Sequence, residues 1–112
     1  MRAMKEITLP TISPAREVSM HLQFSQEYPQ LLVRSHPAGY LRIMKNEEVV
    51  ALVIKGLENW VLLSEDEKNE YPCSSLNQVA LLISVLQQSG LDWLRVDEFF
   101  NYSREELDLD FD

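Results

Sequence analysis

The sequence predicts an α+β fold, in which an antiparallel meander of three to four strands packs against a long helix from the C-terminal half and an N-terminal helix beside it. Three observations indicate this class. The run from Val49 to Ile54 is uncharged and rich in β-branched residues, residues 71–91 contain no charged side chain, and turn-forming segments separate short apolar runs between residues 30 and 63. At 112 residues we expect one domain, 1–112, with 1–12 and 103–112 peripheral or mobile.

The first predicted element is a helix over about residues 14–28. Ser13 is a suitable N-cap and Pro14 suits the first helical position. Apolar residues at 15, 18 and 22 share one helical face, and Pro29 would end the helix. Apolar residues at 18, 20, 22 and 24 also alternate as in a strand, so a strand remains the alternative.

The strands of the meander follow. We expect Tyr40–Met44, Val49–Ile54 and Trp60–Leu63 to be strands, and 31–33 is an additional candidate. The segments 35–39, 45–48 and 55–59 carry the turn residues between them. An uncharged strand such as Val49–Ile54 is typical of a sheet covered on both faces.

The long helix is predicted over 75–89. Ser75 and Gln78 have the spacing of a capping box, and Gly90 suits the residue after the C-cap. Before it, 64–70 is expected to be a solvated acidic loop. After it, 91–96 is expected to be a last strand or an extended connector with its tryptophan packed inward, and Ser103 with Glu106 would cap only a very short helix.

On a helical wheel the apolar residues of this helix form one broad face, which contains Val79, Ala80, Leu82, Ile83 and Leu86. We expect Ile83 and Leu86 to pack near residues 50, 52 or 54 of the best strand. Leu81 and Val85 fall outside this face. Either a second element covers them, or they belong to a partner surface, in which case a two-fold homodimer through this helix would hide them.

Charge is unevenly distributed along the chain. Residues 1–55 carry seven Lys/Arg and five Asp/Glu, a net +2, whereas residues 56–112 carry three and thirteen, a net −10. No basic stripe is present, so we expect no nucleic-acid partner. The longest unbroken apolar part of the charge-free run is 79–83, too short to span a bilayer. With a single cysteine and no secretion signal, a cytoplasmic location is expected.

No catalytic, metal or cofactor site is expected. Cys73 could pair with His21 or His36 as nucleophile and base, but its acidic surroundings would raise the thiol pKa. Two histidines without a recognisable ligand spacing do not indicate a metal site. The sequence has no phosphate-binding loop, dinucleotide fingerprint or nucleophile elbow.

The C-terminal segment combines aromatic and acidic residues. Phe99, Phe100 and Tyr102 cannot all face one interior, and an acidic stretch follows them. The predicted partner-binding residues are Leu81, Val85, Phe99, Phe100, Tyr102, Glu105, Glu106, Asp108 and Phe111. The alternative is that Phe99 or Phe100 closes the core and the acidic tail is merely solvated.

The expected order of elements resembles the helix–three strands–helix layout of type III secretion chaperones and related small adaptor domains. The resemblance covers about residues 14–89 and concerns architecture alone. It implies a non-enzymatic adaptor or chaperone-like module that binds a segment of another protein, which the acidic half predicts to be basic. Two alternatives remain: an acidic inhibitor or immunity-type protein that covers a basic active site, and a small enzyme with an unrecognised site.

Overall fold

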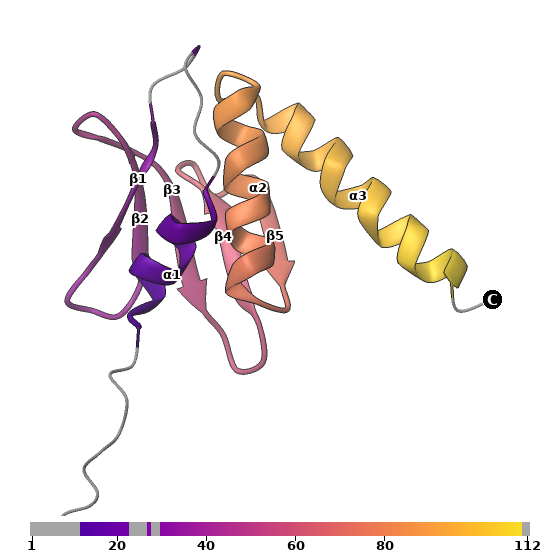
Figure 1. The fold of residues 1–112 in the computed structure, drawn as a ribbon, viewed down its shortest axis with the longest axis horizontal. Helices are drawn as coiled ribbons and strands as arrows, with labels where there is room; N and C mark the ends of the chain where they lie inside the picture. Colours follow the sequence, from indigo (N-terminus) through magenta and orange to yellow (C-terminus); the bar gives the residue numbers. More distant parts are fainter. Residues whose placement is uncertain (1–11, 23–26, 28–29, 111–112) are drawn as a thin grey trace, which may run out of the picture.

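The computed structural model describes residues 12–22, 27 and 30–110, with side chains described as far as residue 102. It confirms the α+β class with three helices and one antiparallel sheet (Figure 1). The elements are α1 (Pro14–His21), β1 (Leu32–Ser35), β2 (Leu41–Lys45), β3 (Glu48–Lys55), β4 (Trp60–Ser64), β5 (Glu70–Cys73), α2 (Leu76–Gln88) and α3 (Trp93–Asp110).

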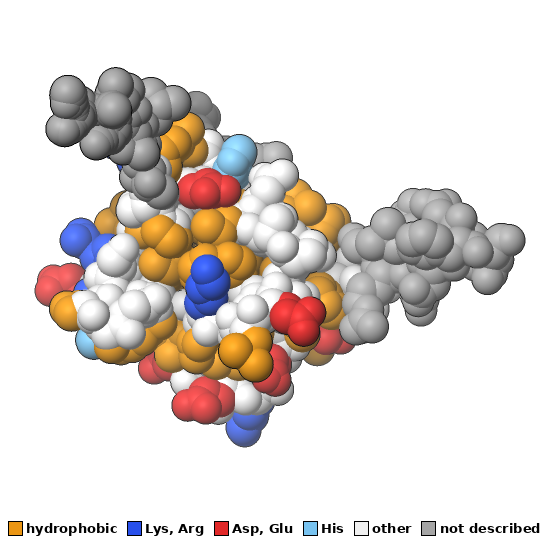
Figure 2. All heavy atoms as spheres, turned by 90° about the horizontal axis from the view of Figure 1, so that it is seen from below, with side chains coloured by type: hydrophobic (Ala, Val, Ile, Leu, Met, Phe, Trp, Pro, Cys, Tyr) orange, Lys and Arg blue, Asp and Glu red, His pale blue; other side chains and the backbone are white. Residues whose placement is uncertain are grey.

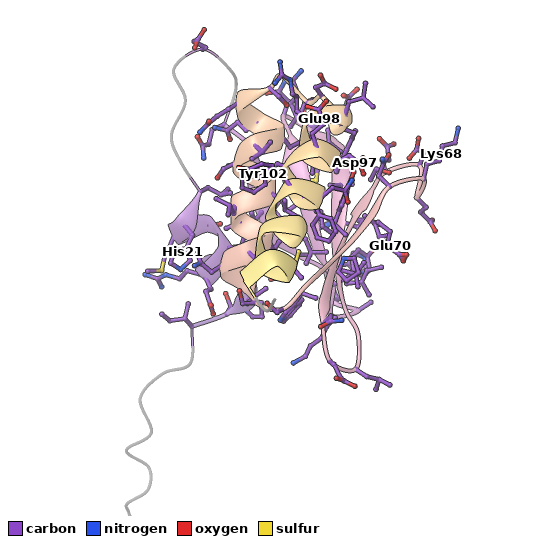
Figure 3. The ribbon with its side chains drawn as sticks, turned by 90° about the vertical axis from the view of Figure 1, so that its right-hand side faces the viewer. His21, Lys68, Glu70, Asp97, Glu98 and Tyr102 are labelled. Carbon is purple, nitrogen blue, oxygen red and sulfur yellow. The ribbon has the colours of Figure 1, made fainter. Side chains whose placement is uncertain are left out.

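The five strands form a simple meander in the order β1-β2-β3-β4-β5, and each neighbouring pair is antiparallel. The views in Figures 1 and 3 agree that all three described helices lie on the same side of the sheet. The fold therefore has two layers, with the hydrophobic core between the helices and one sheet face.

The strands alternate between a buried face and an open face. The buried face contributes Leu41, Ile43, Ala51, Val53, Leu62, Tyr71 and Cys73, each at most 2% exposed. Ile83 and Leu86 of α2 are fully buried, as expected. Of the three neighbours expected for them, Val50 packs against the core, and residues 51 and 53 carry the rest of the helix-facing side of β3. Leu52 and Ile54 point to the open face, and Val50 sits at a β-bulge.

Both ends of α2 follow the predicted capping pattern. The Ser75 hydroxyl accepts a hydrogen bond from the Gln78 amide (3.2 Å). The Gln78 side chain accepts from the amide of Ser74 (2.9 Å) rather than from that of Ser75. At the other end, Gly90 has φ +73° and the Leu91 amide donates to the Leu86 carbonyl (2.8 Å), which completes a Schellman motif.

The N-terminal helix is shorter than predicted. Ser13 caps it by accepting from the Arg16 amide (3.2 Å), and Ala15 and Val18 are buried. It ends at His21, because Leu22 has extended backbone (φ −72°, ψ 138°). Phe24 and Pro29, which entered the prediction, lie outside the described residues. α1 packs against α2, and Ser84 of α2 is only 4% exposed.

Two elements were not predicted. Residues 70–73 form β5 at the sheet edge, so the expected acidic loop ends one residue earlier. The expected strand or connector over 91–96 was wrong, since α3 begins at Trp93. The expected helix start at Ser103 was also wrong, because α3 continues through this position to Asp110. The expectation of a mobile end falls partly on residues 111–112, which lie outside the described residues.

Candidate protein-binding site

The candidate binding site is a hollow at the junction of α2 and α3, which we call the groove. Val85, Gln88, Ser89, Asp92 and Arg95 line an open hollow of about 450 Å³. These residues flank the turn that joins α2 to α3, and Figure 1 shows the two helices diverging from this turn. Its lining combines one apolar side chain with polar and charged ones, unlike the mostly apolar lining of a small-molecule pocket.

Each helix carries one stripe of residues, of which Val85, Gln88 and Arg95 line the hollow. On α2 the stripe is Leu81, Val85 and Gln88, spaced i, i+4 and i+7. On α3 it is Arg95, Phe99 and Tyr102 with the same spacing, so these three share one helix face. We name these six residues the α2–α3 stripe. Figure 3 labels Tyr102 on α3, and Figure 1 shows that α3 diverges from α2 towards its C-terminal end.

The stripe keeps apolar surface in contact with solvent. Leu81 is 44% exposed and Tyr102 is 64% exposed. Val85 and Phe99 are half-buried and pack against the core. Leu81, Val85, Phe99 and Tyr102 were predicted from the sequence as partner-binding residues. Of these, Val85 belongs to the lining of the hollow, and Leu81 and Tyr102 are exposed on their helices.

Phe100 has a different position. It is 7% exposed, and its ring meets the Tyr71 ring edge-on at a centroid distance of 5.2 Å. Trp93 stacks on the same Tyr71 ring at 6.1 Å. Phe100 therefore takes the core-closing role that was the alternative in the sequence analysis. Together with Trp93 it fixes α3 against β5 and so sets the orientation of the stripe.

The start of α3 is held by a local hydrogen-bond network. The Asp92 amide donates to the Ser89 hydroxyl (3.1 Å), and the Leu94 amide donates to the Asp92 carboxylate (3.0 Å). Asp92 thus caps α3. These contacts tie the α2–α3 turn, which supplies Ser89 and Asp92 to the hollow, to the start of α3.

The acidic residues expected in the site lie farther along α3. Residues 103–110 continue the helix and carry four carboxylates and one arginine in the sequence. The side chains of Glu105, Glu106 and Asp108 and the whole of Phe111 lie outside the described residues. Figure 1 shows this half of α3 running away from the sheet and from α2.

The candidate nucleophile and bases are not brought together. Cys73 is fully buried in β5, and burial raises the pKa of its thiol to about 12. His36 lies at the β1–β2 turn, stacks on Tyr40 (4.3 Å) and accepts from the Ala38 amide (3.0 Å). Since β1 and β5 are opposite edges of the sheet, about 19 Å separates the strands that carry these residues. His21 is exposed at the end of α1 (Figure 3).

A second hollow of about 440 Å³ lies beside the β4–β5 turn and is lined by Val50, Ser64, Glu65, Asp66, Leu91 and Trp93. Its polar groups serve the turn. The Ser64 hydroxyl donates to the Asp66 carboxylate (2.7 Å) and accepts from the Asn69 amide (3.0 Å). The hydrogen bond from Ser64 lowers the pKa of Asp66, and the Lys68 amide adds to this effect. These hydrogen bonds give Ser64 and Asp66 a role in stabilising the β4–β5 turn.

One polar residue of α2 has a structural role that the sequence analysis missed. Gln87 is 1% exposed, and its side-chain oxygen accepts from the Leu31 amide (2.9 Å). This bond fixes the start of β1 on the helical layer. The signal was present in the sequence, because the helical period places Gln87 on the apolar face with Ala80 and Ile83, where a glutamine indicates a buried hydrogen bond.

Charged side chains stand singly among hydrophobic and neutral ones on the face seen in Figure 2. Among the described residues no group of three or more His, Cys, Asp or Glu could hold a metal ion. Within the same residues, no helix has the length and apolar character needed to cross a bilayer.

No protein-family model, curated protein or solved structure matches this chain. The resemblance to type III secretion chaperones was drawn for three strands between two helices. Five uninterrupted strands stand between α1 and α2, so the layout on which that resemblance rested differs from the observed one.

Proposed function

We propose that the protein is a non-enzymatic, cytoplasmic binding module that holds a basic amphipathic helix of a partner protein in the groove between α2 and α3. The observation that carries the proposal is the hollow where α2 meets α3, lined by Val85, Gln88 and Arg95, with Leu81 and Tyr102 exposed in the same i, i+4, i+7 rows of the two helices. Helix-in-groove recognition uses this spacing on the bound helix as well.

The charge of the chain favours a basic partner. Residues 56–112, which include both groove helices, have a net charge of −10. The acidic residues of α3 beyond Tyr102 would attract Lys and Arg on the polar side of a bound helix and increase its association rate. Apolar residues of the partner would then contact Leu81, Val85 and Tyr102 and slow dissociation.

A pair of synthetic helical peptides tests this proposal. Both carry leucine at i, i+3, i+4 and i+7, one with lysine and the other with glutamate at the remaining positions. We expect the lysine peptide to bind and the glutamate peptide not to bind in fluorescence anisotropy. Leu81→Ala and Tyr102→Ala should each weaken binding about tenfold, equivalent to about 1.4 kcal/mol.

Leu94→Ala is the matched control, because Leu94 is 74% exposed on α3 but lies outside the stripe. It should bind the lysine peptide as the wild type does. Equal losses in the Leu94 and Tyr102 variants, or equal binding of both peptides, would contradict the groove. If the Glu105→Gln, Glu106→Gln, Asp108→Asn variant loses most of the affinity while Tyr102→Ala loses none, the acidic-inhibitor alternative is favoured.

A further inference from the structure

The open face of the sheet is apolar although no described helix covers it. It carries Leu32, Met44, Val49, Leu52, Ile54, Val61, Leu63 and Pro72. None of these side chains is fully buried, and Leu32 and Ile54 are 43% and 40% exposed. The opposite face is almost completely buried. An apolar face of this kind marks an interaction surface.

Charged residues on this face follow one cross-strand row. Strand register aligns Arg34 with Arg42, Arg42 with Leu52, Leu52 with Leu63, and Leu63 with Glu70. The row therefore crosses all five strands and reads basic, basic, apolar, apolar, acidic. Two largely apolar rows flank it, one towards each end of the strands.

We propose that this face binds a second copy of the chain, sheet against sheet, with the two-fold axis parallel to β3. That axis reverses the row in the partner copy. Arg34 then faces Glu70 of the second copy, and Leu52 faces the same residue of the second copy. An axis perpendicular to the strands would instead set like charges against one another at both edges. The row is thus self-complementary for one orientation only.

Arg42 is the second basic residue of the row, and its guanidinium is incompletely hydrogen-bonded among the described residues. Its Nε is buried and has no hydrogen-bond partner among the described residues, and one Nη donates only a long bond to the Ser35 carbonyl (3.5 Å). Buried guanidinium donors normally have acceptors. In the dimer Arg42 lies opposite Leu63, one strand from Glu70 of the second copy, so that carboxylate reaches both arginines of the row.

The dimensions of the face indicate a weak dimer. Five strands about 4.8 Å apart and about five residues long give a flat footprint of roughly 20 × 20 Å. This is smaller than the about 800 Å² per partner of a standard interface. We therefore expect reversible dimerisation in the micromolar range, with the two sheets about 10 Å apart.

Sedimentation equilibrium over a concentration series tests the orientation by charge reversal. Arg34→Glu and Glu70→Arg should each weaken self-association by about tenfold or more, because two symmetry-related pairs change from attraction to repulsion. Mixing the two variants in equal amounts should restore dimerisation, since every facing pair in the mixed dimer is again of opposite charge. Failure of the mixture to restore it would overturn the proposed axis.

Leu52→Lys tests the centre of the interface and should abolish the dimer by placing two like charges at the axis. Leu57→Lys, at a fully exposed leucine in the β3–β4 turn, is the control and should dimerise normally. Circular dichroism and thermal unfolding would confirm that both variants fold. A wild-type protein that stays monomeric throughout, or a dimer that Leu81→Lys disrupts and Leu52→Lys leaves intact, would overturn the proposal.

Discussion

Two leucines on α2 allow the central packing of the fold to be measured with the same substitution. Leu86 is fully buried between α2 and the sheet, whereas Leu81 on the outer side is 44% exposed. Leu86→Ala removes buried methyl groups and leaves a cavity, which costs about 2–5 kcal/mol of unfolding free energy. Leu81→Ala loses roughly half of a leucine burial energy, about 1 kcal/mol.

Both positions lie in α2 and both carry leucine. The small gain in helix propensity from alanine is therefore the same in the two variants and cancels when their unfolding free energies are compared. Urea unfolding followed by circular dichroism at one low protein concentration would give both values. A domain of this size has about 5–15 kcal/mol of stability, so the Leu86 variant should lose a large fraction of it. Equal losses for the two variants would show that α2 does not pack through its predicted face, and the two-layer core would have to be abandoned.

Three further measurements address single contacts. Gln87→Met should cost about 1–3 kcal/mol, because the buried Leu31 amide loses its acceptor, and hydrogen exchange of that amide should accelerate. Ser75→Ala should cost about 1 kcal/mol and Ser75→Asp much less, as read from thermal unfolding. Burial raises the pKa of Cys73 to about 12, so its stabilising contribution is complete below about pH 8.5 and is lost as the pH rises towards 12. Cys73→Ala should show a shallower alkaline loss of stability, and the native thiol should react with Ellman's reagent only in denaturant.

The sequence predicted those elements whose local signals agree with their packing. Ser13 and Ser75 begin helices as expected, and Gly90 supplies the positive φ that ends α2. The buried face of β3 was not predictable, because an uninterrupted apolar run has no alternation to distinguish its two sides. The same run led to the expectation that both faces of the sheet are covered, whereas the described helices cover only one face.

The missed elements had weaker signals. β5 alternates glutamate, tyrosine, proline and cysteine, which is a strand pattern, and its proline is tolerated because β5 is an edge strand. α3 contributes to the core mainly through Trp93, Val96 and Phe100, whose i, i+3, i+7 spacing is helical. The few apolar residues of this acidic segment do not by themselves predict a helix packed on the core, because the sequence does not show that the Tyr71 ring lies against them.

The two proposed surfaces lie on opposite sides of the core, and this geometry makes a prediction about their coupling. A dimer formed through the open sheet face leaves both α2–α3 grooves accessible, so the lysine peptide should bind monomer and dimer with equal affinity. A dimer formed through Leu81 and Val85 would cover the groove, and the peptide would then dissociate it by mass action. Sedimentation velocity with increasing peptide separates the two arrangements. With sheet-face dimerisation, a partner carrying two linked copies of the basic helix should also bind more tightly than one copy, and the Leu52→Lys variant should lose that gain while keeping the affinity for a single helix.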